Sequence, residues 1–216
     1  MSRPLILYGN LSSDKLELLA RALQQGQAII YPTETLYGIG CDAINETAVS
    51  LVYQAKGRST TKPLPLIASD LEMIKKSCDL GGVPKNLFSF WPGPLTMLLP
   101  ARIAFAKPLV DAEGRVAIRI SASPCAREIA HALGRPITAT SANLSGKPPC
   151  STKDALDQEL VRKIGIGAFL GAEPGGGAPS TIVSVTPKGT VFVHREGAVS
   201  KKELQEAGLV LAGQDS

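Results

Sequence analysis

"SSDKLELLARALQQGQAIIYPTETLYGIG", residues 12–40, joins a helical pattern directly to a strand and a loop that contains glycine. Apolar side chains recur at helical spacing between residues 14 and 25, behind a serine pair whose hydroxyls can cap the first turn. The apolar run QAIIYP follows at once and predicts a strand. Because helices that alternate with strands build α/β folds, this stretch decides the fold class.

The same alternation continues to the end of the chain. The last two predicted strands are joined by TPKG, which predicts an antiparallel hairpin, so we expect an α/β fold with a twisted mixed sheet flanked by helices. We expect a single domain over residues 1–216, with a C-terminal tail from about residue 208. The further helices are predicted near residues 45–55, 69–77 and 124–133, from Ser151-x-x-Asp154 and from Ser200-x-x-Glu203, and the further strands near 64–67, 95–99, 115–120, 165–170, 180–185 and 190–194.

Composition is that of an ordinary globular protein, with 44% hydrophobic residues and a net charge of +4. No apolar run approaches the roughly 20 residues of a membrane span, and no basic and apolar leader opens the chain, so we expect a cytoplasmic protein without membrane contact. The modest positive charge is compatible with nucleic acid or with an anionic small molecule. The four cysteines, Cys41, Cys78, Cys125 and Cys150, lie far apart without a metal-binding or disulfide pattern and are predicted to be buried thiols.

The loop after the first strand, YPTETLYGIG, is one candidate binding segment. Ligands of open α/β sheets bind at the carboxyl ends of strands, where such loops collect. Thr33 and Thr35 offer hydroxyls on one side of the loop, and Tyr37 offers a ring with a polar tip. The alternative is a turn whose hydroxyls bond its own backbone.

A cluster of cations in AKGRSTTKPLPLI, residues 55–67, is a candidate seat for a polyanion. Arg58 can grip two phosphate oxygens, while Lys56 and Lys62 supply point charges around Gly57, where the backbone can approach a ligand. A solvated surface is the alternative. Neither the standard phosphate loop nor the dinucleotide-binding fingerprint occurs in the chain.

Polar residues also cluster in later segments. In the strand RVAIRIS, Arg115 and Arg119 lie four residues apart on one face and should be hydrated or paired with an anion. The segment ITATSANLSGKPP carries small hydroxyl and amide side chains, and the glycine run Gly175–Gly177 allows either a lid or a surface loop. The chain shows no Ser/His/Asp arrangement and no histidine pair at metal spacing, so no resident metal site is predicted.

The order of these motifs, PTETLYG, KGR, KPLPLI, WPGPLT, RVAIR, TSANLSG, PSTIV and HREG, resembles the YrdC-domain family, and within it the threonylcarbamoyl-AMP synthases. The resemblance covers about residues 12–202 and is to the short, single-domain type. It implies a YrdC-like fold with a cationic concave cavity. It also implies an enzyme that joins L-threonine, bicarbonate and ATP, with Mg²⁺, into threonylcarbamoyl-AMP and pyrophosphate for tRNA modification. A separate transferase complex would take over the product.

Site roles follow from the resemblance position by position. Lys56 and Arg58 are expected to carry catalysis by holding phosphates. The expected substrate contacts are Thr33, Thr35, Tyr37, Arg119, which would pair with the substrate carboxylate, Ser141 and Ser180, and the expected nucleotide contacts are Lys56, Arg58, Lys62, Arg115, Thr140, Asn143 and Arg195.

Two positions depart from the family pattern, and three alternatives stay open. Ile67 stands where longer members have a histidine, and Ser184 follows PSTIV where they often have aspartate. No residue is assigned as a general base. The alternatives are a non-catalytic domain that binds RNA, a paralogue with another nucleotide-dependent carbamoyl transfer, and a regulatory domain that binds nucleotide without turnover. Weak binding of RNA or tRNA is left open as a further partner contact.

Overall fold

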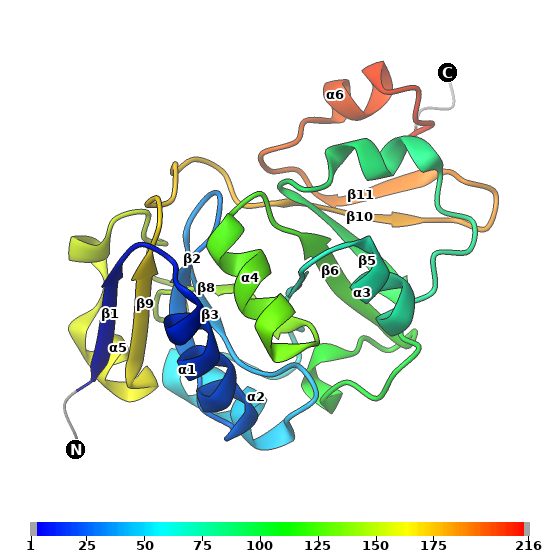
Figure 1. Cartoon of the computed structure of the whole chain (residues 1–216). Coiled ribbons are helices and arrows are strands. Elements are labelled where there is room, and N and C mark those ends of the chain that lie inside the picture. Colours follow the sequence, from blue (N-terminus) through cyan, green and yellow to red (C-terminus); the bar gives the residue numbers. More distant parts are fainter. Residues whose placement is uncertain (1–3, 214–216) are drawn as a thin grey trace.

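In the computed structural model of the protein, the structure is described for residues 4–213. Helices and strands alternate along most of the chain, as the sequence predicts (Figure 1). The helices are α1 (Ser13–Gln24), α2 (Glu46–Lys56), α3 (Leu71–Ser77), α4 (Pro124–Leu133), α5 (Gln158–Ile164) and α6 (Lys201–Glu206), with short 3-10 helices at Lys85–Phe90, Lys107–Leu109 and Lys153–Ala155. The strands are β1 (Leu5–Gly9), β2 (Ile29–Pro32), β3 (Tyr37–Gly40), β4 (Leu66–Ala68), β5 (Leu95–Pro100), β6 (Arg115–Ile120), β7 (Ile137–Thr138), β8 (Thr140–Ser141), β9 (Ile166–Leu170), β10 (Thr181–Val185) and β11 (Val191–Arg195).

The strands form two mixed sheets, where the sequence predicted one. The first sheet has the order β1-β9-β2-β3-β8 and the second the order β11-β10-β5-β6-β4-β7. Parallel pairs such as β4 with β6 lie beside antiparallel pairs such as β5 with β6, so the prediction of a mixed α/β fold is confirmed. The number of sheets is corrected because the chain crosses from the second sheet to the first at Ala139, between β7 and β8. Local patterns do not report which strands pair.

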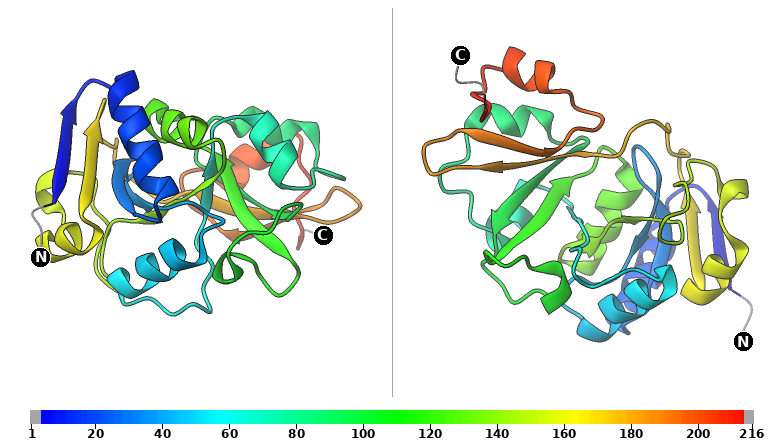
Figure 2. Two further views of the ribbon diagram at one scale, coloured as in Figure 1. Left: turned by 60° about the horizontal axis from the view of Figure 1, so that its bottom comes forward. Right: turned by 180° about the vertical axis from the view of Figure 1, so that it is seen from behind.

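Helices cover both faces of the first sheet. Strand β2 is buried on both sides, since Ile29 and Tyr31 face α1 and α4 while Ile30 faces the cluster that contains residues of α2 and α5. Helices α1 and α4 lie side by side, and α2 and α5 appear on the opposite side of the molecule (Figures 1 and 2).

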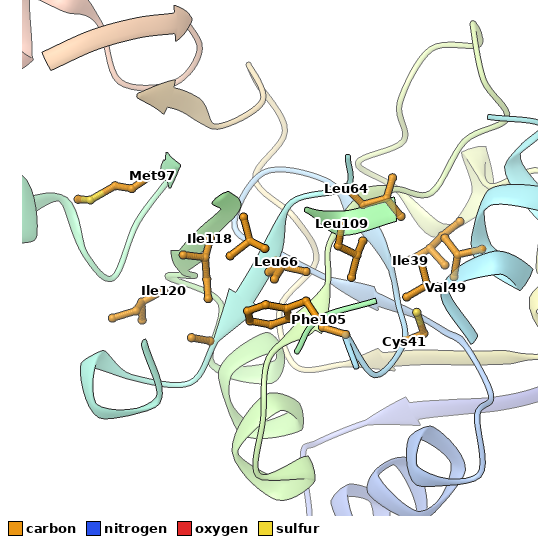
Figure 3. Close-up of a cluster of buried hydrophobic side chains, with 14 of the residues drawn as sticks. Ile39, Cys41, Val49, Leu64, Leu66, Met97, Phe105, Leu109, Ile118 and Ile120 are labelled. Atoms are coloured by element: carbon orange, nitrogen blue, oxygen red, sulfur yellow. The ribbon is translucent and has the colours of Figure 1, made fainter. Parts of the chain in front are cut away.

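The larger apolar cluster joins the two sheets. Ile39 of the first sheet and Leu66 and Ile118 of the second belong to one buried group, with Val49 of α2 beside Ile39 (Figure 3). The second sheet is therefore not a separate layer but shares its interior with the first, which fixes the geometry of the gap between them.

Local predictions are largely confirmed. Strands β10 and β11 form the expected antiparallel hairpin, and Ser200 forms the expected capping box with Glu203. The helix expected from Ser151 is wrong by seven residues: α5 starts at Gln158 because the Asp157 carboxylate accepts hydrogen bonds from the amides of residues 159 and 160.

The described part of the predicted C-terminal tail, residues 208–213, is packed, which corrects that prediction. Leu209 and Leu211 are buried in the larger cluster, and Leu211 bridges to Val191 of β11. Leu209 and Leu211 are buried while Val210 between them is exposed. All three residues are apolar, so the sequence shows no alternation of apolar and polar residues from which to predict this packing. Residues 214–216 lie outside the described range.

The remaining expectations on thiols and membranes can be compared directly. All four cysteines are free and buried, as predicted, and burial raises the pKa of Cys41 and Cys125 to about 12. None of the helices within residues 4–213 combines the length and apolar character that crossing a membrane requires.

Substituting Leu211→Ala should lower the free energy of unfolding by about 2 kcal/mol or more, because a buried leucine leaves a cavity. Val210→Ala is the matched control: its side chain is 68% exposed, and the change should stay within about 0.5 kcal/mol. Urea unfolding of both variants measures the difference. Equal effects at the two positions would mean that the segment does not pack in solution.

Candidate active site

A cavity of about 220 Å³ opens where the two sheets meet. The first sheet contributes the loop between β2 and β3 and strand β8, and the second contributes the carboxyl end of β6 and the start of β10. Segments far apart in the sequence therefore surround one space. Of the predicted site residues, the following line it: Thr33, Thr35, Tyr37, Arg58, Arg119, Thr140, Ser141, Ser180 and Arg195.

The PTET loop gives its two threonines different tasks. The Thr33 hydroxyl donates to the Leu36 carbonyl at 2.7 Å and accepts from the Leu36 amide, so it builds the turn. Within residues 4–213, no hydrogen bond is formed by the Thr35 hydroxyl, although Thr35 is buried against the cavity. Burial, and then the nearby Glu173 carboxylate, raise the pKa of Tyr37 to about 12, so its hydroxyl stays protonated at neutral pH. Thr35 and Tyr37 are thus the free polar contacts of this wall.

Lys56 lies behind the cavity wall. It ends α2 and is 2% exposed, and its Nζ donates to the carbonyls of Ser141 and, at 2.6 Å, of Asn143. Burial, and then repulsion by Arg58, lower the pKa of Lys56 to about 8. The predicted phosphate ligand therefore ties the SAN segment to α2 and does not line the cavity.

Arg58 reaches the cavity because the chain turns at Gly57. This glycine caps α2 with φ of 59°, a left-handed conformation that side chains disfavour. The Arg58 Nε donates to the Lys62 carbonyl at 3.3 Å. Lys62 is exposed and outside the lining, so its ammonium is placed at the surface.

Arg119 is held by a residue that the sequence reasoning missed. Its Nε donates to Glu34 Oε1 at 3.0 Å, and the Ser121 hydroxyl donates to Glu34 Oε2. Burial opposes ionisation of Glu34, but Arg119, Ser121 and a backbone hydrogen bond together keep the pKa of Glu34 below its usual value. The signal in the sequence was the acidic residue between two threonines, which could have supplied the anion that a buried strand arginine requires.

Ser180 and Arg195 form the opposite wall. Arg195 Nη2 donates to the Ser180 carbonyl at 2.7 Å, and the Thr96 hydroxyl donates to Ser180 Oγ at 2.9 Å. The HREG turn lies so close that a Cβ on Gly197 would stand 2.0 Å from the Pro179 carbonyl oxygen, so only glycine fits there. This close approach places the Arg195 guanidinium beside Ser180.

Arg115 and Asn143 are not brought into the cavity. Arg115 pairs with Asp111 at 2.9 Å and with Glu113 at 2.8 Å, and it lines a separate hollow. It shares a strand with Arg119 but starts it, so it lies at the far end from the cavity. Asn143 folds onto its own loop, where its Nδ2 donates to the Leu144 and Lys147 carbonyls.

The positions that depart from the family pattern are also outside the lining. Ile67 is fully buried in the cluster under α1 and α4. Ser184 hydrogen-bonds His194 Nε2 at 2.7 Å.

The glycine run contacts the PTET loop, because the amides of Gly175 and Gly176 donate to the carbonyls of Glu34 and Thr35.

Three guanidiniums give the cavity its electrostatic character. Arg58, Arg119 and Arg195 come from three separate segments, and desolvation, then repulsion by Arg119 and Arg58, lower the pKa of Arg195. Glu34 offsets one of these charges. Within residues 4–213 no three His, Cys, Asp or Glu side chains are grouped as a metal site. The arrangement suits an anion with several negative oxygens.

The buried lysine predicts a specific pH dependence. Between pH 8 and the ordinary lysine pKa of about 10.4, the unfolded chain binds a proton that folded Lys56 has lost, so stability from this group rises with pH. Urea unfolding of the wild type and of Lys56→Met at pH 7 and 9.5 should show the wild type gaining about 1–2 kcal/mol on the variant. A constant difference between the two proteins would contradict a lowered pKa.

A family model and several named relatives match most of this chain. The family model described as "Telomere recombination", which groups Sua5, YciO and YrdC proteins, matches residues 21–197. A protein of Photobacterium profundum named threonylcarbamoyl-AMP synthase is 37% identical over 167 residues, which cover 76% of this chain and 89% of that protein. A protein of Methylococcus capsulatus with the same name is 40% identical over 157 residues, or 72% of this chain and 84% of that protein.

A solved structure is similar over nearly the whole chain. The crystal structure of P. abyssi Sua5 complexed with L-threonine superposes with a TM-score of 0.85 at 28% identity. It covers 96% of this chain, which spans 61% of that longer protein. The family match and the extent of these similarities establish that the chain belongs to the Sua5, YciO and YrdC family.

Proposed function

We propose that the cavity forms threonylcarbamoyl-AMP and pyrophosphate from L-threonine, bicarbonate and ATP, as a threonylcarbamoyl-AMP synthase. The observation that carries the proposal is the convergence of Arg58, Arg119 and Arg195 with free hydroxyls on one cavity between the sheets. The relatives that bear this name support it, as does the related P. abyssi protein crystallised with L-threonine.

Two of the arginines suit the nucleotide and one suits the amino acid. Arg58 is half-buried and Arg195 is exposed, and both line the cavity, where they would spread charge over the phosphates. Arg119 lies deeper, 4% exposed, and would pair with the threonine carboxylate beside Thr35. Ser141, Thr140 and Ser180 offer short hydroxyl contacts. Lys56 would act on catalysis by holding the Ser141 segment in place.

The chemistry needs positioning more than a side-chain nucleophile. The threonine amine attacks the bicarbonate carbon and water leaves, and a carbamate oxygen then attacks the α-phosphorus while the bond to pyrophosphate breaks. Holding the two anions in line would lower the barrier, and the guanidiniums would stabilise the charge on the leaving pyrophosphate.

We propose that Mg²⁺ arrives with ATP. Both oxygens of Glu34 are engaged by Arg119 and Ser121, so the donor set fits an ion held mainly by phosphate oxygens and water. When bound, the ion would neutralise phosphate charge. The chain's own contribution is the set of arginines around the phosphates.

We further propose that the product is handed to a threonylcarbamoyl transferase complex in the cytoplasm. A carbamoyl-adenylate is a reactive mixed anhydride, which requires rapid transfer to its acceptor. Direct contact with tRNA would use the same positive potential, and its expected signature is a steep dependence on salt.

The test is pyrophosphate release by the purified protein with ATP, Mg²⁺ and bicarbonate, with and without L-threonine. Release should require threonine and bicarbonate, and Arg58→Ala should reduce it about 100-fold, as expected for loss of a charge that stabilises the transition state. Lys56→Ala should reduce it by disordering the Ser141 segment.

Arg115→Ala is the matched control, because this arginine lies on the same strand as Arg119 but outside the cavity. Its rate should stay within about threefold of the wild type. A large loss of pyrophosphate release in Arg115→Ala would support the contact between Arg115 and the nucleotide that the sequence predicted. Nucleotide binding without threonine-dependent release would favour a binding module or a carbamoyl-transfer paralogue.

A further inference from the structure

We propose that Glu34 is a positioning residue that orients Arg119 toward the amino-acid substrate. The inference rests on the proposed function, in which Arg119 pairs with the threonine carboxylate. Glu34 acts through the arginine and does not touch the substrate itself.

The contact uses only one edge of the guanidinium. Arg119 Nε donates to Glu34 Oε1 at 3.0 Å, and the two side chains are 5% and 11% exposed. Within residues 4–213, no hydrogen bond to a protein acceptor is made by the two terminal amino groups of Arg119, which lines the cavity. A carboxylate on the Nε edge therefore leaves the forked end of the guanidinium available for a second carboxylate.

Glu34 contacts Arg119 from outside the cavity that Arg119 lines, and it borders a separate hollow of about 290 Å³. Thr33 and Thr35 line the cavity, whereas Glu34 between them does not. Its second oxygen accepts from the Ser121 hydroxyl, so both oxygens are occupied. Arg119, Ser121 and a backbone hydrogen bond outweigh burial and keep the pKa of Glu34 low, so it is a poor proton acceptor at neutral pH. A role as general base is therefore disfavoured.

Charge repulsion explains why Arg119 needs a fixed partner. Arg58 and Arg195 line the same cavity and carry the same charge. Without Glu34, a buried guanidinium would be free to change rotamer or to recruit another anion. Because Glu34 contacts Arg119 alone of the three arginines, its loss should weaken binding of the amino acid more than binding of the nucleotide.

The experiment measures pyrophosphate release against threonine and against ATP for Glu34→Ala and Glu34→Gln. Asp111→Asn is the matched control. Asp111 accepts from Nε of Arg115 at 2.9 Å, and Arg115 lies on the same strand as Arg119 but away from the cavity. Glu34→Ala should raise the KM for threonine about tenfold or more and the KM for ATP less than about threefold. Glu34→Gln keeps an acceptor of the same shape, so its effect should be smaller. Asp111→Asn should leave both values unchanged.

A second readout follows the arginine directly. In ¹H–¹⁵N spectra, the Nε–H of Arg119 should exchange slowly with water in the wild type and quickly in Glu34→Ala. Equal rises in both KM values, or a loss of activity that only tracks a lower Tm, would overturn the positioning role.

The two proposals fail in different ways. A wild-type protein without threonine-dependent release contradicts the synthase function. In that case the Nε–H signal decides the role of Glu34: exchange that is unchanged by Glu34→Ala overturns it, and faster exchange supports it.

Discussion

The ion pair between Glu34 and Arg119 is the interaction around which the site is organised, because it joins the two sheets. Glu34 follows β2 of the first sheet, and Arg119 lies near the end of β6 in the second. Both side chains are almost fully buried, so desolvation opposes the pair and its strength depends on the added hydrogen bond from Ser121. Removing either side chain would leave the other charge buried and unpaired between the two sheets, beside the cavity.

Backbone contacts extend this organisation around the cavity. Lys56 holds two carbonyls of the Ser141 segment, and Thr181 accepts hydrogen bonds from the amides of Gly197 and Val199, which fixes the turn that carries Arg195. Each polar wall is thus supported by a buried group that does not face the ligand. Such support matters because catalysis by positioning loses rate steeply when a contact group moves by about 1 Å.

The sequence was informative where a residue acts through its own segment. Thr35 follows β2, Arg58 follows α2 and Ser180 directly precedes β10, each in a motif with several polar neighbours, and the structure places them together. It was less informative where the role depends on a partner from elsewhere. Lys56 was predicted to face phosphates because its charge is visible in the sequence, whereas the carbonyls that capture it come from residues 141 and 143. Arg115 was grouped with Arg119 by strand period, which gives the face of a strand but not which end reaches the site.

The charges of the site oppose one another before any anion binds. Desolvation, and then repulsion by Arg119 and Arg58, lower the pKa of Arg195, and burial lowers the pKa of Lys56 to about 8. Repulsion among the arginines lowers the stability of the empty folded protein. An anion that contacts the arginines removes part of this repulsion, so the relief of repulsion adds to its binding free energy. Glu34 limits the repulsion without filling the cavity, because its carboxylate stands behind the wall. The fold therefore keeps an excess of positive charge at the cavity, because the carboxylate that pairs with Arg119 lies outside the cavity lining.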